Sequence, residues 1–169
     1  MLKLMTLSMA FAVLVSIAPS QGSLGPMTFH GLDPLRVGMT PSEAALALKD
    51  ELTPYDGTAA TASCYMVFPS KRPELLLMVE DGAIVRVETE SDEFSTLSGV
   101  RVGDTEDHAR GVYEGRLSVE GHPYDPQGHY LVVESDDGQY AMVLETDGAH
   151  VTQIRAGLLP AVRYIEHCL

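Results

Sequence analysis

The feature that most constrains the fold is a helix start that occurs twice, 65 residues apart. The segments "RVGMTPSEA" (36–44) and "RVGDTEDHA" (101–109) share Arg, Val, Gly, Thr and Ala at equivalent positions. Two further pairs follow in the same order. "YMV" (65–67) matches "YLV" (130–132), and "DGA" (81–83) matches "DGA" (147–149). Three matches in one order, with a drift of one residue, indicate an internal duplication. We therefore predict a single domain over 31–169, built of repeats at about 31–94 and 95–169.

Each repeat is predicted to begin with a capped helix. Thr40 is a suitable N-cap, Pro41 fits the first helical position, and Glu43 completes a capping box. Thr105 is placed to cap the helix of the second repeat. The first helix is expected over 41–52, with an apolar stripe at Ala44, Leu48 and Leu52.

Antiparallel strands are predicted to follow each helix. "CYMVFP" (64–69) is a short β-prone run, and "ELLLMVE" and "AIVRVET" are joined at Asp81-Gly82 as in a hairpin. A second hairpin is expected in "YAMVLETDGAHVTQI". Alternation in "AIVRVET" predicts a dry face with Val85, Val87 and Thr89, and a wet face with Arg86 and Glu88. The predicted fold is α+β, with helices on one side of a shared antiparallel sheet whose other face is exposed or used for binding.

The N-terminal segment is typical of an exported precursor. "MLKLMTLSMAFAVLVSIAPS" (1–20) has one charge, an apolar run and small residues at its end, which predicts a cleaved signal peptide. A flexible leader is expected at 21–30 because Gly, Ser and Pro are frequent there. The region lacks a lipobox cysteine. We expect a periplasmic or secreted protein without stable membrane insertion after signal removal.

The number of cysteines and the net charge further restrict the kinds of site and partner that we expect. Two cysteines in an oxidising compartment predict one disulfide, Cys64–Cys168, since CxxC spacing for a redox or metal site is absent. The net charge of −13 disfavours nucleic acid as a partner and favours a basic protein, although solubility alone would also explain it. No cofactor is predicted.

The helix start also resembles a known family. "LRVGMTPSEA" (35–44) is similar to the start of the repeat in the SmpA/OmlA family of outer-membrane lipoproteins, and the tandem arrangement resembles the β-lactamase inhibitory protein fold. The resemblance implies a non-enzymatic protein that binds other proteins through a concave sheet. The absent lipobox departs from the lipoprotein pattern. The segments at 113–133 and 154–168 resemble small secreted proteobacterial proteins of unassigned function.

The segment "HPYDPQGH" (122–129) concentrates the candidate binding residues, which are His122, Tyr124, Asp125, Gln127 and His129. A metal would use His122, Asp125 and His129, although their spacing matches no ligand motif. A sugar or peptide would use the ring of Tyr124 and the polar side chains beside it. The structural alternative is a turn whose polar side chains bind their own backbone. Tyr130, in the following strand, is expected to be core.

Motifs for catalysis are missing from the sequence. It contains no G-x-S-x-G elbow, P-loop, dinucleotide fingerprint or H-E-x-x-H, so a hydrolase with an unrecognised carboxylate pair is the least favoured class. The sequence therefore predicts a non-enzymatic extracytoplasmic binding protein, with enzyme inhibition as one form of its activity. The alternative is a carbohydrate- or metal-binding module that uses the 122–129 loop.

Overall fold

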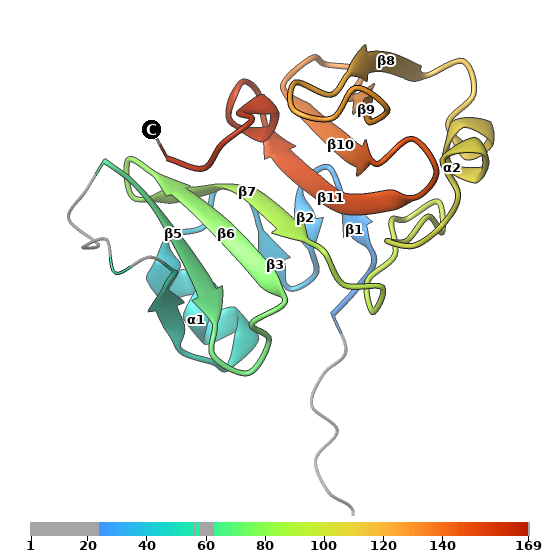
Figure 1. Ribbon diagram of the computed structural model, residues 1–169. Helices are drawn as coiled ribbons and strands as arrows, with labels where there is room; N and C mark the ends of the chain where they lie inside the picture. The colour runs from blue at the N-terminus through green and yellow to red at the C-terminus, as the bar shows by residue number, and fades with distance from the viewer. Residues whose placement is uncertain (1–23, 56, 58–62, 169) are drawn as a thin grey trace, which may run out of the picture.

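The fold is dominated by one eight-stranded antiparallel sheet (Figure 1). The computed structural model describes residues 24–55, 57 and 63–168. Its strand order is β4-β5-β6-β7-β11-β10-β9-β8. These strands are β4 (Leu52–Pro54), β5 (Cys64–Pro69), β6 (Leu75–Glu80), β7 (Ala83–Thr89), β8 (Leu117–Gly121), β9 (His129–Glu134), β10 (Tyr140–Thr146) and β11 (Val151–Leu158).

A small second sheet and three short helices complete the described part of the chain. The sheet contains β1 (Met27–Thr28), β2 (Gly31–Leu32) and β3 (Leu35–Arg36). The helices are α1 (Pro41–Leu48), α2 (Glu106–Val112) and the 3-10 turn η1 (Ala161–Arg163). The molecule is thus mostly β with two short α-helices, which confirms the α+β class in its broad form. Neither α-helix is long and apolar enough to cross a membrane.

The strand order of the main sheet is the same from either edge. Each half consists of a helix followed by four strands, and the halves meet where β7 pairs with β11. The pairs at this junction run from Ile154 with Thr89 to Gly157 with Arg86. The two segments predicted to be repeats therefore supply the two halves of one sheet.

The main core lies on one face of this sheet, under both helices and the small sheet. Buried residues of the central strands form it, among them Leu77, Val87, Leu144 and Ala156. Ala44 and Leu48 of α1 and Ala109 of α2 belong to the same cluster. Both helices therefore pack on the same face, which leaves the opposite face of the sheet for other contacts.

The helix starts follow the sequence prediction, but the end of α1 does not. Thr40 and Glu43 form the expected capping box, and the Thr105 hydroxyl accepts from His108 N. The predicted helix over 41–52 is too long, because the chain turns into the left-handed region at Lys49 (φ 51°). Leu52 instead begins β4 and pairs with Pro69 of β5.

The first hairpin has the predicted strands and turn, but its face assignment is wrong. A bulge between Met78 and Val79 moves Val85 out of the main core to the opposite face, where it packs with Met78. Arg86 and Glu88, predicted to be wet, are only 1% and 2% exposed. The alternation rule fails here because a bulge shifts the register and because other residues cover the second face.

The N-terminal predictions are only partly within the described residues. The signal peptide (1–20) lies outside them. Of the expected flexible leader (21–30), residues 24–30 are described, and here the structure differs from the expectation. Met27–Thr28 form β1, and Met27 is buried in the main core. Met27 N also donates to Ser95 O at 2.8 Å, which ties the leader to the second half of the chain.

Candidate functional site

The C-terminal residues 160–168, here called the strap, cross the second face of the main sheet (Figure 1). Ala161 packs with Met78 and Val85, and Val162 packs with Tyr130 and Val143. Tyr130 is buried, as predicted. The expectation of an open second face is therefore wrong at its centre, where the strap covers both halves of the sheet.

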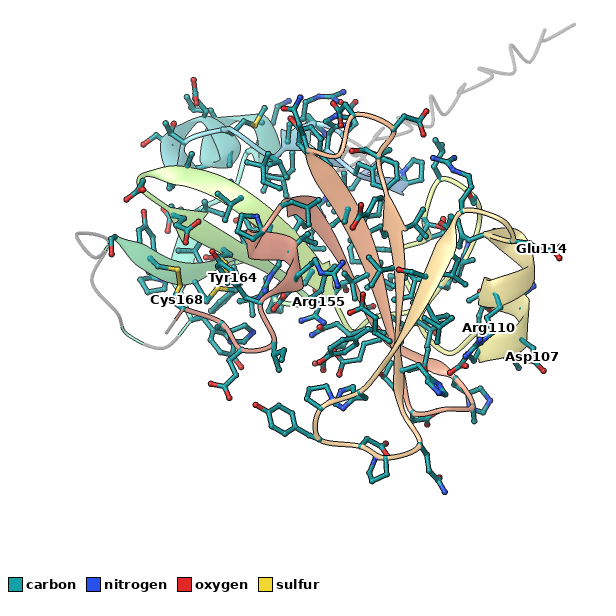
Figure 2. All side chains as sticks on the ribbon, turned by 90° about the horizontal axis from the view of Figure 1, so that it is seen from above. Asp107, Arg110, Glu114, Arg155, Tyr164 and Cys168 are labelled. Atoms are coloured by element: carbon teal, nitrogen blue, oxygen red, sulfur yellow. A yellow bond between two sulfur atoms is a disulfide. The ribbon has the colours of Figure 1, made fainter. Side chains whose placement is uncertain are left out.

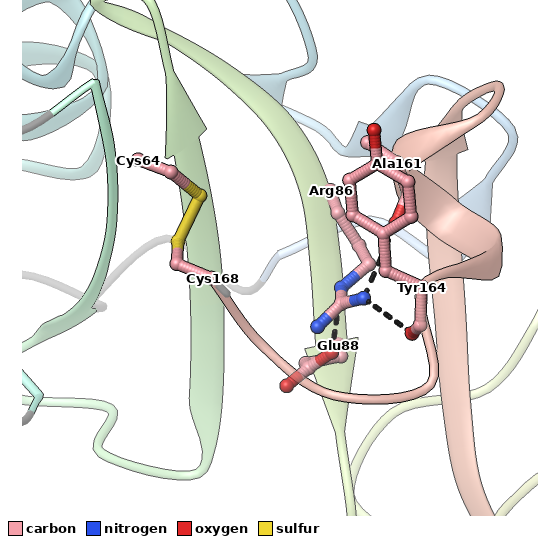
Figure 3. Close-up of a disulfide and its surroundings, with 6 residues drawn as sticks. All are labelled: Cys64, Arg86, Glu88, Ala161, Tyr164 and Cys168. Carbon is pink, nitrogen blue, oxygen red and sulfur yellow. Dashed lines mark hydrogen bonds and ion pairs between the residues drawn. A yellow bond between two sulfur atoms is a disulfide. The ribbon is translucent and has the colours of Figure 1, made fainter.

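Two buried arginines bind the main chain of the strap, and Figure 3 shows one of them, Arg86. Arg86 Nη1 donates to Ala161 O at 3.2 Å and to Tyr164 O at 3.0 Å. Arg155 Nη1 donates to the same Tyr164 O at 3.0 Å. Carbonyl oxygens of the strap thus satisfy donors that would otherwise be left buried without partners.

Glu88 balances part of this buried positive charge. Arg86 Nε lies 2.8 Å from Glu88 Oε2, and His167 Nε2 donates to Glu88 Oε1 at 2.9 Å. Burial lowers the pKa of Arg86, the neighbouring Glu88 opposes that change, and Arg155 adds to it. The strap therefore covers paired charges as well as apolar side chains of the sheet.

The predicted disulfide between Cys64 and Cys168 is confirmed. It fixes the end of the strap to β5, so the bond joins the first half of the sheet to the last residues of the second (Figure 3). Such bonds form and persist in oxidising compartments. The disulfide therefore indicates an extracytoplasmic protein.

The 122–129 loop uses its polar side chains largely to hold its own shape. His122 Nδ1 accepts from the backbone N–H groups of Tyr124 and Asp125, so its ring proton is on Nε2, which lies 3.0 Å from Glu145 Oε1. Asp125 Oδ1 accepts from Gln127 N at 2.9 Å. These are the contacts that the structural alternative predicts.

The two histidines of this loop turn to opposite faces of the sheet. His122 packs edge-on against Tyr130, on the strap side. His129 shares its face with Leu131 of the main core and donates through Nδ1 to Glu106 of α2 at 3.0 Å. The structure therefore does not bring His122, Asp125 and His129 to one point. Within the described ranges, no group of three or more His, Cys, Asp or Glu side chains is arranged to hold a metal ion.

Tyr124 is the exposed aromatic residue of this loop. Its ring is 68% exposed, and its hydroxyl donates to Glu166 of the strap at 2.8 Å. Tyr164 and Ile165 of the strap are also exposed, as is Tyr55, whose ring lies edge-on to His167. These five residues, Tyr55, Tyr124, Tyr164, Ile165 and His167, are here called the strap surface. Figure 2 shows Tyr164 and Cys168 on this side, apart from the labelled residues of α2.

A pocket of about 340 Å³ opens beside the strap surface. His167 of the strap and Tyr55 lie on its rim, and the buried Glu88 contributes to its wall. The remaining lining residues are Pro73, Glu74, Leu76, Thr89, Glu90, Ser91 and Gln153. The pocket thus combines carboxylates, an aromatic rim and a partly apolar wall.

The sequence prediction missed the residues that bind the strap. Arg86, Glu88 and Arg155 lie in runs of apolar strand residues, and alternation assigns such charges to solvent. A signal was present, since Arg155 of β11 pairs with Glu88 of β7, which places charged residues of the two central strands next to each other. Recognising it requires knowing that β7 pairs with β11.

Comparison with known proteins found similarity only among solved structures. No protein-family model and no curated protein sequence matches the chain. A solved structure, that of the uncharacterized protein YfeY from Escherichia coli, is similar with a TM-score of 0.46 and 12% identity. The match covers 78% of this chain and 99% of that one. The predicted resemblance to the outer-membrane lipoprotein family is not shown by these comparisons.

Proposed function

We propose that this protein is a non-enzymatic extracytoplasmic binding protein that recognises a basic protein through the strap surface. The observation that carries the proposal is the group of exposed side chains held around the strap. Tyr55 is 56% exposed and Ile165 47%. Tyr55 lies against His167, and the Tyr124 hydroxyl donates to Glu166, so both tyrosines contact the strap. Exposed aromatic and aliphatic side chains that lie together favour a protein interface.

The charge of the chain supports a basic partner. The net charge is −13, and Glu90 and Glu166 are exposed next to the strap surface. A field of one sign accelerates association with an oppositely charged protein and weakens as salt is added. The same field opposes binding to nucleic acid.

The location proposed is the periplasm or the exterior, reached by a signal peptide cleaved after residue 20. The disulfide supports an oxidising compartment. Because the signal region contains no cysteine, the mature protein is not expected to be anchored by a lipid there. The fold is proposed to be an internal duplication, which the symmetrical strand order supports.

Affinity capture from periplasmic extract and culture supernatant tests the function. We expect the exported protein, with its disulfide intact, to retain one basic protein at about 0.02 M salt and to release it at about 0.5 M. The Tyr124→Ala/Ile165→Ala variant should lose that protein. Leu97→Ala, which removes an equally exposed side chain on the α-helical side of the molecule, should keep it. A partner retained by all three forms would overturn the use of the strap surface.

A carbohydrate module is the second candidate, and the exposure of Tyr124 and Gln127 in one loop favours it. A sugar ring would stack on Tyr124, and Gln127 would supply hydrogen bonds. A glycan array distinguishes this function. Binding that is lost in Tyr124→Ala and indifferent to salt would support the sugar, whereas a blank array would eliminate it.

A further inference from the structure

We propose that the pocket beside the strap surface receives a single arginine or lysine side chain of the partner. This inference rests on the proposed binding function and names the group that the site recognises. The pocket volume of about 340 Å³ falls at the lower end of the range of ligand pockets, about 300–1,000 Å³. The pocket is therefore large enough to hold one long side chain of a partner.

The charges that line the pocket favour a cation. Glu88 is already paired with Arg86, and it accepts a hydrogen bond from His167 of the strap. Glu74 and Glu90 have no such partner, since neither forms an ion pair with a described residue. Two residues of the lining, Glu74 and Glu90, thus carry carboxylates with no ion-pair partner among the described residues, next to the buried and paired Glu88. Glu90 Oε1 accepts a hydrogen bond from Gln153 at 3.4 Å, which is the contact that a bound cation would supplement.

The uncharged walls suit the rest of a long basic side chain. Leu76 and Pro73 offer apolar contact for the methylene groups. Tyr55 presents its ring at the rim, 5.7 Å from the His167 ring, where a guanidinium or ammonium group can lie against it. The lining therefore provides an apolar wall for the stem and carboxylates for the charged end.

The pocket and the strap surface are continuous. Tyr55 and His167 belong to both, so a protein that covers Tyr164 and Ile165 extends directly to the pocket mouth. His167 is adjacent to Cys168, which is bound to β5. The disulfide therefore holds in place one wall of the proposed subsite.

A peptide titration tests the inference directly. The isotope-labelled exported protein would be titrated with acetyl-Gly-Arg-Gly-amide, and backbone amide shifts would be followed by NMR. The control peptide has citrulline in place of arginine, which keeps the shape and removes the charge. We expect saturable shifts at Glu74, Glu90 and Gln153 with the arginine peptide and at least fivefold weaker binding of the citrulline peptide.

Protein variants make the test specific to the two unpaired carboxylates. Glu74→Gln and Glu90→Gln should each weaken the arginine peptide by about fivefold at low salt. Asp136→Asn makes the same change in net charge at a remote, 98% exposed carboxylate and should leave binding unchanged. Spectra that match the wild type outside the pocket show that the variants are folded. Equal binding of both peptides, or equal binding by all variants, would overturn the inference.

The capture experiment separates this inference from the proposed function. If Tyr124→Ala/Ile165→Ala abolishes capture while Glu74→Gln/Glu90→Gln captures like the wild type, the subsite is refuted and the strap surface stands. If neither variant changes capture, the proposed use of the strap surface fails. The peptide titration then still decides whether the pocket binds cations.

Discussion

At the residue scale, Arg86 and Glu88 are charged side chains that depend on each other, because both are almost fully buried. Removing one member of such a pair leaves the other charge uncompensated and costs about 3–5 kcal/mol, whereas replacing both by apolar residues can be neutral. We predict that Arg86→Met lowers the free energy of unfolding by about 3–5 kcal/mol. Arg86→Met/Glu88→Leu should lower it by much less. Urea unfolding measures both, and equal losses would contradict the pairing argument.

A second prediction at this scale concerns pH. Burial acts to raise the pKa of Glu106, but hydrogen bonds from Thr146, His129 and Arg110 outweigh it and hold the pKa below its ordinary value of 4.5. A carboxylate with a lower pKa in the folded state stabilises the protein above its unfolded pKa, and this contribution is lost as the pH falls through the folded pKa. We therefore expect the free energy of unfolding to fall below about pH 4.5.

The Glu106→Gln variant checks the origin of that slope. It should be less stable than the wild type at pH 7, by about 1–3 kcal/mol for a buried hydrogen-bonded group, and should lose less stability on acidification. Glu93→Gln, at an exposed position, is the control and should follow the wild type. Parallel pH curves for Glu106→Gln and the wild type would show that Glu106 does not contribute to the slope.

At the scale of elements, features set by neighbouring residues could be predicted from the sequence, whereas the covering of a strand by a distant segment could not. The capping box at Thr40, the turn at Asp81-Gly82 and the strand at 64–69 depend on neighbouring residues, so the sequence indicates them directly. The end of α1 depends on a left-handed residue at Lys49, for which the sequence carries no glycine signal. The burial of Arg86 depends on a carbonyl 75 residues away, which no local pattern contains.

The strap is an element whose stability can be tested on its own. The disulfide spans 104 residues, and in the chain-entropy model a loop of that length contributes about 4–5 kcal/mol. We predict that Cys64→Ser/Cys168→Ser lowers the free energy of unfolding by up to that amount. Amide hydrogen exchange at Arg163 and Tyr164 should accelerate, whereas exchange in β6 should change only with global stability. Unchanged protection of the strap would mean that the hydrogen bonds from Arg86 and Arg155 hold it in place without the disulfide.

At the scale of the whole molecule, the two halves of the sheet form one cooperative unit. They share the β7–β11 pairing, the main core, and a strap that crosses both. We predict that residues 24–94 alone do not fold, because β7 would lose its pairing with β11, and Arg86 and Glu88 would lose the strap that covers them. An amide spectrum with poor dispersion would agree with this prediction. A dispersed, native-like spectrum would show that the first repeat is an autonomous domain.

Under the proposed export through an N-terminal signal peptide, the position of the two cysteines would also set an order of events. Translocation proceeds from the N-terminus, so Cys64 reaches the oxidising side first and waits while 104 further residues follow. With only two cysteines in the chain, it has no incorrect intramolecular partner in that interval. The thiols can join only after both repeats have arrived. The disulfide would therefore form only in chains that had been delivered through the end of the second predicted repeat. Molecules whose delivery stopped before that point would keep a free Cys64 thiol.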